Sequence, residues 1–101
     1  MHRISVEYYG PNNTEAFEQH YRDVHVPLAA KIPGLRRFTL SYPRGLGTAS
    51  PQAVAEMWFD DAGALTAALK SPEMASAGAD AQTFALQETR MFSGEVIELT
   101  I

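Results

Sequence analysis

The sequence predicts a single α+β domain over residues 1–101, with its strands and helices in the order βαββαβ. Apolar and polar residues alternate with a period of two in four segments, as they do in strands. Between these segments lie two regions with helical spacing, and Gly, Pro and Asn residues mark the junctions. A chain of 101 residues can bury one hydrophobic core and has no room for a second domain.

The composition restricts the class of function. Apolar residues make up 46% of the chain and charged residues 20%, which is typical of a globular protein and excludes disorder. A net charge of -4 argues against nucleic-acid or anionic-membrane partners. The absence of Cys excludes disulfides, thiolate catalysis and Cys-based metal sites. Neither a signal peptide nor a membrane span of about 18 apolar residues is recognisable, so we expect a cytoplasmic protein without a membrane partner.

The first strand and the first helix are expected in the N-terminal third of the chain. Alternation over residues 4–9 predicts a strand, which a turn-forming Gly-Pro-Asn-Asn segment ends. Apolar residues then recur every three or four positions over residues 14–32, which predicts a helix. Pro27 cannot donate a backbone hydrogen bond and disfavours helical geometry at the residue before it. We therefore expect the helix to kink or restart beside His25.

The remaining segments complete the predicted order. Residues 35–42 and 53–59 alternate and predict two strands, with a loop rich in Pro and Gly between them. Cap residues and helical spacing predict a broken helical region over residues 61–84. The last strand is expected over residues 89–101, with a bulge at Gly94. This order is typical of the ferredoxin-like sandwich, an antiparallel sheet with both helices on one face.

The two faces of the predicted sheet differ in composition. One face is almost wholly apolar and is expected to lie under the helices. The other carries Tyr9, Val54, Glu56 and Trp58, a mixture too aromatic for a solvated surface and too polar for a core. We therefore predict a homodimer that pairs through this face. A monomer with a few exposed aromatic residues is the alternative.

The first helix carries two candidate catalytic residues, His25 and Tyr21. They lie four positions apart and are therefore neighbours on the helix. His25 is expected at the flank of the apolar stripe formed by Phe17, Val24 and Leu28. A histidine can transfer a proton near neutral pH, and tyrosine hydroxyls can add hydrogen bonds in an apolar cavity. The residues that we expect to bind a small molecule there are Val6, Tyr8, Val24, Leu28, Phe38, Leu40, Met57 and Phe59.

From spacing alone, a structural role explains His25 better than a catalytic one. A single histidine on a helix flank is commonly a structural residue, and spaced aromatic residues commonly form core. His20 is expected to point to the opposite flank and His2 lies at the chain start, so neither should join His25. We therefore predict no metal site and no cofactor.

Residues 21–38 resemble the signature of the EthD family, named for ethyl tert-butyl ether degradation. The likeness consists of Tyr-x3-His-x-Pro-Leu followed by Ile-Pro-Gly, and similarity continues in residues 55–60, 71–74 and 79–84. The resemblance implies a dimeric α+β barrel, in which ferredoxin-like monomers pair through their sheets and ligands sit between helices and sheet. It also implies that His25 and Tyr21 lie at the cavity wall. The wider superfamily contains isomerases, polyketide cyclases, cofactor-free monooxygenases and haem-degrading enzymes.

We accordingly expect a small homodimer that binds a hydrophobic or aromatic, carbonyl-bearing metabolite. Catalysis would be cofactor-independent proton transfer, with His25 as general base or acid and Tyr21 or Tyr8 donating to an enolate oxygen. Isomerisation, cyclisation, dehydration and decarboxylation would all use this arrangement. Two alternatives remain: a non-catalytic auxiliary protein that supports an oxygenase, and, less strongly supported, a haem-binding protein with His25 as axial ligand.

Overall fold

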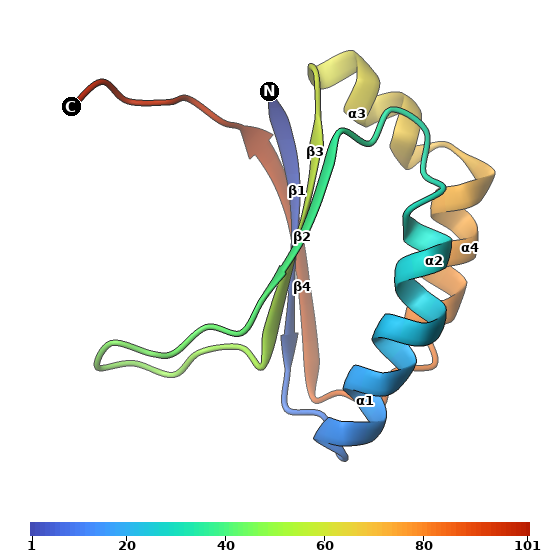
Figure 1. Cartoon of the computed structure of the whole chain (residues 1–101), viewed down its shortest axis with the longest axis vertical. Coiled ribbons are helices and arrows are strands. Elements are labelled where there is room, and N and C mark those ends of the chain that lie inside the picture. The colour runs from blue at the N-terminus through green and yellow to red at the C-terminus, as the bar shows by residue number, and fades with distance from the viewer.

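The computed structural model describes residues 1–101 and shows a four-stranded antiparallel sheet with helices on one face (Figure 1). The elements in chain order are β1 (His2–Tyr9), α1 (Thr14–His20), the π-helical segment η1 (Tyr21–His25), α2 (Val26–Ala29), β2 (Arg37–Ser41), β3 (Ala53–Phe59), α3 (Ala62–Leu69), α4 (Pro72–Ala81) and β4 (Glu88–Glu95). The strand order is β2-β3-β1-β4, and all neighbouring strands are antiparallel. The predicted α+β ferredoxin-like fold is therefore confirmed. None of the helices has both the length and the apolar character needed to cross a bilayer.

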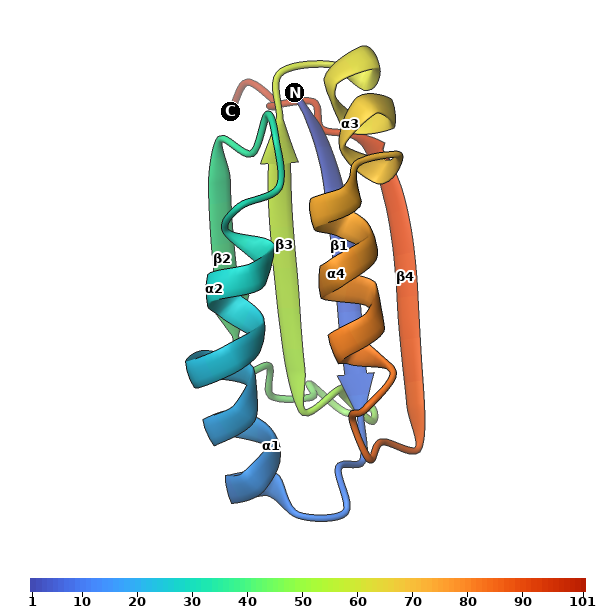
Figure 2. The same cartoon turned by 90° about the vertical axis from the view of Figure 1, so that its right-hand side faces the viewer.

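The hydrophobic core lies between the sheet and the helices. Figure 2 shows the α1–α2 segment and α4 running side by side over one face of the sheet. Strand register pairs Ile4 with Met57 and Val6 with Ala55, and all four side chains are buried under the helices. Burying a large apolar side chain contributes about 1.5–3 kcal/mol, so this alternation gives β1 and β3 a defined inner face. The sequence prediction that this face packs under the helices is confirmed.

The first helical region changes its winding in the middle. The N–H of Val26 donates to the carbonyl of Tyr21, five residues earlier, which is the hydrogen bond of a π-helix. Regular α-helical winding resumes in α2, where Pro27 occupies the first turn and needs no partner for an N–H. The predicted restart beside His25 is therefore present, as a wider turn that ends at His25.

This wider turn decides which residues face the sheet. In a regular α-helix, four residues cover about 400°, so positions four apart drift by about 40° at each step. The extra residue in η1 offsets this drift, and positions four apart remain on the inner face. The buried positions are Phe17, Tyr21, His25 and Ala29. The expected stripe through Val24 and Leu28 was wrong, because Val24 is 41% exposed and Leu28 is half-buried.

The last strand is shorter than expected and has no bulge. β4 ends at Glu95, and the register with β1 runs without interruption through Gly94, which pairs with Arg3. Beyond this point β1 has ended, and the N–H of Val96 makes the last backbone bond, to the carbonyl of Met1. With no strand to pair with, residues 96–101 leave the sheet (Figure 1).

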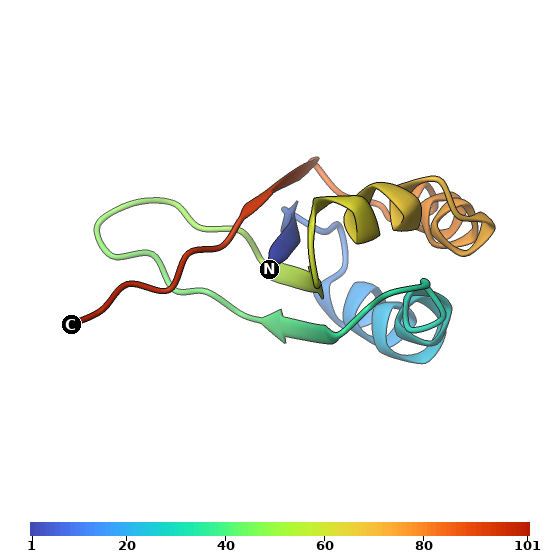
Figure 3. The same cartoon turned by 90° about the horizontal axis from the view of Figure 1, so that it is seen from above.

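Two segments project from the sheet on the side away from the helices. These are the β2–β3 connection, residues 42–52, and the C-terminal residues 96–101, and we refer to them as the two arms (Figures 1 and 3). Both expose apolar side chains, among them Leu46 in the first arm and Ile97 and Leu99 in the second. The open face of the sheet therefore lies between two apolar extensions.

Candidate functional site

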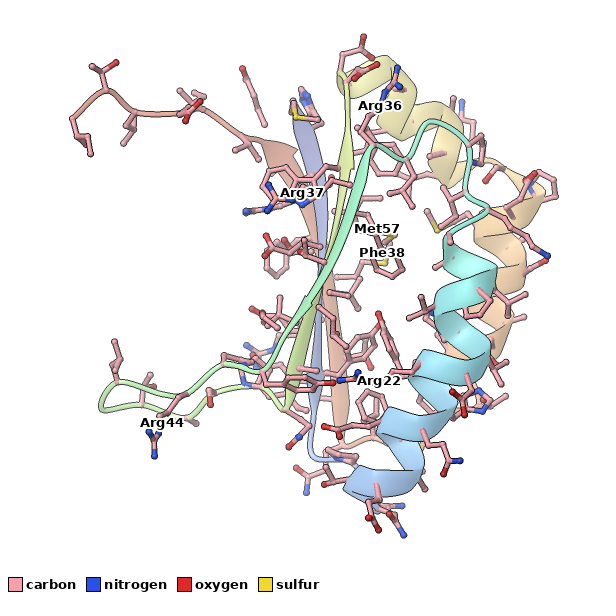
Figure 4. The ribbon with its side chains drawn as sticks, viewed as in Figure 1. Arg22, Arg36, Arg37, Phe38, Arg44 and Met57 are labelled. Carbon is pink, nitrogen blue, oxygen red and sulfur yellow. The ribbon has the colours of Figure 1, made fainter.

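A cavity lies between the helices and the inner face of the sheet. Its volume is about 110 Å³, against the roughly 10–15 Å³ that one water molecule requires by the same kind of measure. Figure 4 shows Phe38 and Met57 pointing from the sheet into the space in front of the helices, whereas Arg37 points from the opposite face. The cavity therefore has room for a small organic molecule.

The structure brings together half of the residues that the sequence predicted for ligand binding. Those that line the cavity are Val6, Tyr8, Phe38 and Met57, together with the candidate catalytic residues Tyr21 and His25. The other four lie elsewhere. Val24 and Leu28 are turned away by the π-helical segment, Leu40 borders a separate crevice beside Tyr42, and Phe59 is fully buried in the core. A ligand-binding role for the cavity residues stays a prediction.

One wall of the cavity was missed by the sequence analysis. It is formed by α4 and β4, through the residues Met74, Ala77, Gly78, Ala81, Thr89 and Met91. The α4 residues have the spacing i, i+3, i+4, i+7, which is the signal that could have identified them. The β4 residues depend on strand register, which the sequence does not reveal. Three of the four methionines of the chain, Met57, Met74 and Met91, thus line one cavity.

Asp80, near the end of α4, joins two histidines of the first helical region. Its Oδ2 lies 2.9 Å from Nδ1 of His25, and its Oδ1 lies 2.8 Å from Nε2 of His20. The expectation that His20 stays apart from His25 was therefore wrong. The π-helical turn brings both side chains toward α4, where one carboxylate reaches both. Asp80 appeared in the sequence analysis only within the family resemblance.

This arrangement determines the protonation of His25. The pKa of Asp80 lies below its ordinary value: burial acts to raise it, but the hydrogen bonds from the two histidines outweigh burial. An ionised carboxylate can only accept, so the Nδ1–H of His25 donates to it. Burial lowers the pKa of His25, against the opposing effect of Asp80. At neutral pH His25 is therefore uncharged, and its Nε2 carries a free lone pair and makes no hydrogen bond within the protein.

Tyr21 adds a second unsatisfied polar group beside His25. The two rings lie 5.0 Å apart between centroids, and Tyr21 is only 1% exposed. Its hydroxyl is buried and makes no hydrogen bond of normal geometry, although the Tyr8 hydroxyl lies near enough for each group to affect the pKa of the other. Burial raises the pKa of Tyr8 to about 12 and raises the pKa of Tyr21 above its ordinary value as well. Both hydroxyls are therefore protonated at neutral pH, and that of Tyr21 is available to donate to a ligand.

The rest of the cavity wall is apolar. No Asp, Glu, Lys or Arg side chain lines it, and Thr89 is its remaining polar side chain besides Tyr8, Tyr21 and His25. The chain contains no cluster of three or more His, Asp or Glu side chains arranged to hold a metal ion. The site thus offers one neutral imidazole and a few hydroxyls in an otherwise hydrophobic space.

These features define a ferredoxin-like α+β domain with a ligand-sized cavity between its helices and its sheet. The chain belongs to the EthD family, whose domain matches residues 12–88. A protein from Rhodococcus erythropolis, described as an uncharacterized 11.0 kDa protein in the thcB-thcC intergenic region, is 34% identical over 87 residues. The match covers 84% of this chain and 84% of that protein.

Solved structures agree with this assignment. An EthD family protein from Bacillus halodurans is 31% identical, with a TM-score of 0.87 over 96% of this chain and 99% of that chain. SnoaB from Streptomyces nogalater, a cofactor-independent oxygenase, is 18% identical, with a TM-score of 0.71 over 97% and 94% of the two chains. A dimeric ferredoxin-like protein from Thermobifida fusca is 16% identical, with a TM-score of 0.70 over 95% and 92%. The last two share the fold alone.

Proposed function

We propose that the protein binds an uncharged, hydrophobic or aromatic metabolite with a carbonyl group, and that it catalyses cofactor-independent proton transfer on this metabolite. One observation carries the proposal. In the same apolar cavity, His25 has Nδ1 engaged by Asp80 and Nε2 free, and Tyr21 has a buried hydroxyl without a partner. A base and a hydrogen-bond donor side by side are what enolisation of a carbonyl compound requires.

The chemistry follows from the two free groups. Nε2 of His25 removes a proton from the carbon next to the carbonyl, and the electron pair of the broken C–H bond moves into an enolate. The Tyr21 hydroxyl donates to the enolate oxygen, with Tyr8 as a second candidate donor. Asp80 stabilises the imidazolium, which then returns its proton to carbon or to a leaving group. Isomerisation, cyclisation and dehydration can each use these steps. A decarboxylation would form the enolate by loss of CO2 and would use only the final protonation, and its carboxylate substrate would find no cation in the wall.

The wall composition supports the substrate class. A ligand carboxylate or phosphate would be buried without a cationic partner, because no Lys or Arg lines the cavity. Methionine sulfur makes favourable contacts with aromatic rings and its side chain adapts to irregular shapes. The three methionines and Phe38 therefore favour an uncharged ligand with an aromatic or similarly polarisable ring.

Deuterium exchange tests this proposal without knowledge of the natural substrate. Wild-type protein is incubated with β-tetralone, a cyclic ketone fused to a benzene ring, in D2O at neutral pD, and loss of the α-proton signal is followed by NMR. Positioned proton transfer contributes about 10²- to 10⁴-fold, and His25→Ala should lose most of this acceleration. His2→Ala, which alters a histidine outside the cavity, is the matched control and should exchange at the wild-type rate. Equal rates for wild type and folded His25→Ala would remove His25 from the mechanism.

The same cavity supports a second candidate, a non-catalytic auxiliary protein that holds an intermediate for an oxygenase system. The observation in its favour is the scarcity of polar groups in the wall. In that case wild-type protein would bind β-tetralone and His25→Ala would bind it with a different affinity. Neither wild type nor the variant would accelerate exchange. Haem binding through Nε2 of His25 fits this cavity less well, because the wall has no Lys or Arg to pair with the two propionates. A Soret band that appears on adding haem and is lost in His25→Ala would support it, and no spectral change would reject it.

We also propose that the protein acts as a homodimer through the open face of its sheet. Tyr9, Val54, Glu56 and Trp58 lie on this face, opposite the helices. The indole of Trp58 lies 5.3 Å from the guanidinium groups of both Arg3 and Arg37, and its Nε1 is buried without an acceptor.

Because Nε1 has no exposed surface within one copy, a second copy can supply an acceptor only if the side chains over Trp58 shift on docking. The cost of an unpaired buried N–H favours such a shift. The two apolar arms extend on the same side of the sheet and would pack against that copy. The Thermobifida fusca neighbour, which has the same fold, is dimeric. Sedimentation at micromolar concentration should therefore give twice the monomer mass.

A further inference from the structure

The Asp80 carboxylate connects the cavity to the protein surface. Its Oδ2 contacts His25, whose side chain is 8% exposed, and its Oδ1 contacts His20, whose side chain is 39% exposed. The proposed proton transfer uses His25 and the charge of Asp80. It assigns no role to His20, although His20 hydrogen-bonds the same carboxylate at 2.8 Å, a distance equivalent to the 2.9 Å of the His25 bond.

The second hydrogen bond constrains the orientation of the carboxylate. A carboxylate held through one oxygen can still turn about its terminal torsion, which is broad and roughly two-fold. When each oxygen accepts from a different ring, the plane of the carboxylate is fixed. The direction from which Oδ2 meets Nδ1 of His25 is then fixed as well, and so is the His25 ring.

Packing restrains both imidazoles in the same unit. The ring of Phe84 lies edge-on to both, with centroid distances of 5.8 Å to His20 and 5.0 Å to His25. The ring of Tyr21 also packs against His25, with a centroid distance of 5.0 Å. His20, Asp80 and His25 therefore belong to one packed cluster, and His20 is the most exposed of the three.

We propose that His20 is a positioning residue for His25. By holding Oδ1 of Asp80, it keeps Oδ2 aligned with the Nδ1–H of His25, so that His25 stays in the tautomer with a free Nε2. That this tautomer matters for turnover rests on the proposed function. Which tautomer His25 adopts is independent of that function. An unconstrained neutral imidazole can carry its proton on either nitrogen, and only one of these forms offers a lone pair on Nε2.

Nitrogen NMR of the histidine rings tests this inference without any ligand. Long-range ¹H–¹⁵N correlation spectra distinguish the two neutral tautomers, and wild-type His25 should show the Nδ1–H form. His20→Leu retains packing against Phe84 but donates no hydrogen bond. As the bond between Asp80 and His25 weakens, the tautomer ratio of His25 should shift toward the Nε2–H form, by at most about tenfold, which is the net worth of one hydrogen bond. His20→Gln, which offers an amide N–H to Asp80, should restore the wild-type spectrum.

A control and a second variant keep the result interpretable. His2→Ala removes a histidine outside the cluster and should leave the His25 signals unchanged. If His20→Leu does not fold, His20→Ala provides the same loss of the donor at a side chain that is 39% exposed. A wild-type tautomer ratio in a folded variant without the His20 donor would overturn the inference, as would failure of His20→Gln to differ from His20→Leu. If the spectra are as predicted but the protein does not accelerate β-tetralone exchange, the proposed function is rejected and the inference about His20 stands.

Discussion

Replacement of Tyr21 by Phe should make the protein more stable. The Tyr21 hydroxyl is buried and has no hydrogen-bond partner, in a side chain that is 1% exposed. Leaving a buried donor unsatisfied costs about 1–3 kcal/mol, and Phe removes the hydroxyl while keeping the ring and its contacts. The ring contacts that must survive are those with Tyr8 and His25, at centroid distances of 5.4 Å and 5.0 Å.

This free-energy difference is large enough to measure. For a domain of about 100 residues, 1 kcal/mol corresponds to roughly 4–8 °C in Tm. Thermal and urea unfolding followed by circular dichroism should therefore give a Tm for Tyr21→Phe that is at least about 4 °C above wild type. Tyr42→Phe is the matched control: Tyr42 is 45% exposed and its hydroxyl accepts a hydrogen bond from Arg22, so we expect no rise in Tm. At the same time, Tyr21→Phe should slow β-tetralone exchange, because the enolate oxygen loses its donor.

A lower Tm for Tyr21→Phe would refute this reasoning. It would mean that the hydroxyl has a partner in the folded protein, and that it is not held free for a ligand. A higher Tm combined with wild-type exchange would also contradict the account, since it would leave the unpaired hydroxyl without a catalytic use.

Three further predictions follow from the cavity, the histidine cluster and the open face. Gly78→Ala should raise the free energy of unfolding by about 0.5–1 kcal/mol in urea titrations, because Gly is unfavourable in a helix and an added Cβ meets no atom within 4 Å; Gly78→Phe should fill the cavity and abolish ketone exchange. Because the pKa of His25 is lowered by burial, the unfolded chain binds its proton more readily, so stability should fall as the pH drops below about 6.5, the ordinary value, toward the pKa of the folded state. Urea midpoints measured across this range should show the loss in wild type and a smaller loss in His25→Gln. Trp58→Ala should halve the sedimentation mass if the open face is the dimer interface, and Leu69→Ala, which removes an exposed side chain from α3, should leave that mass unchanged.

Local patterns were sufficient to predict the fold. The alternation of apolar residues in β1 and β3 defined the inner face of the sheet, because a period of two survives in any regular strand. The C-terminal limit of β4 could not be read in this way. Residues 96–101 continue the alternation, but the strand that would pair with them has already ended.

The site was predicted only in part, for reasons that differ between residues. Tyr21 and His25 were found because they are four apart on one helix, and both line the cavity. Val24 and Leu28 were misplaced because the π-helical turn changes the phase of the helix, which a period of 3.6 residues does not anticipate. Asp80 was missed because its contacts with the histidines span 55 and 60 residues of sequence. Such a pairing depends on how α4 packs against η1, and no local pattern encodes it.

The central claim is that an uncharged carbonyl compound binds in the cavity, between the free Nε2 of His25 and the hydroxyl of Tyr21. A crystal structure of the protein with β-tetralone tests this most directly. We predict a ligand enclosed by the three methionines, with its carbonyl oxygen within hydrogen-bond distance of the Tyr21 hydroxyl and its α-carbon beside Nε2 of His25. A ligand that occupies a different surface, or a cavity that remains empty beside His25 at saturating ketone, would contradict the account.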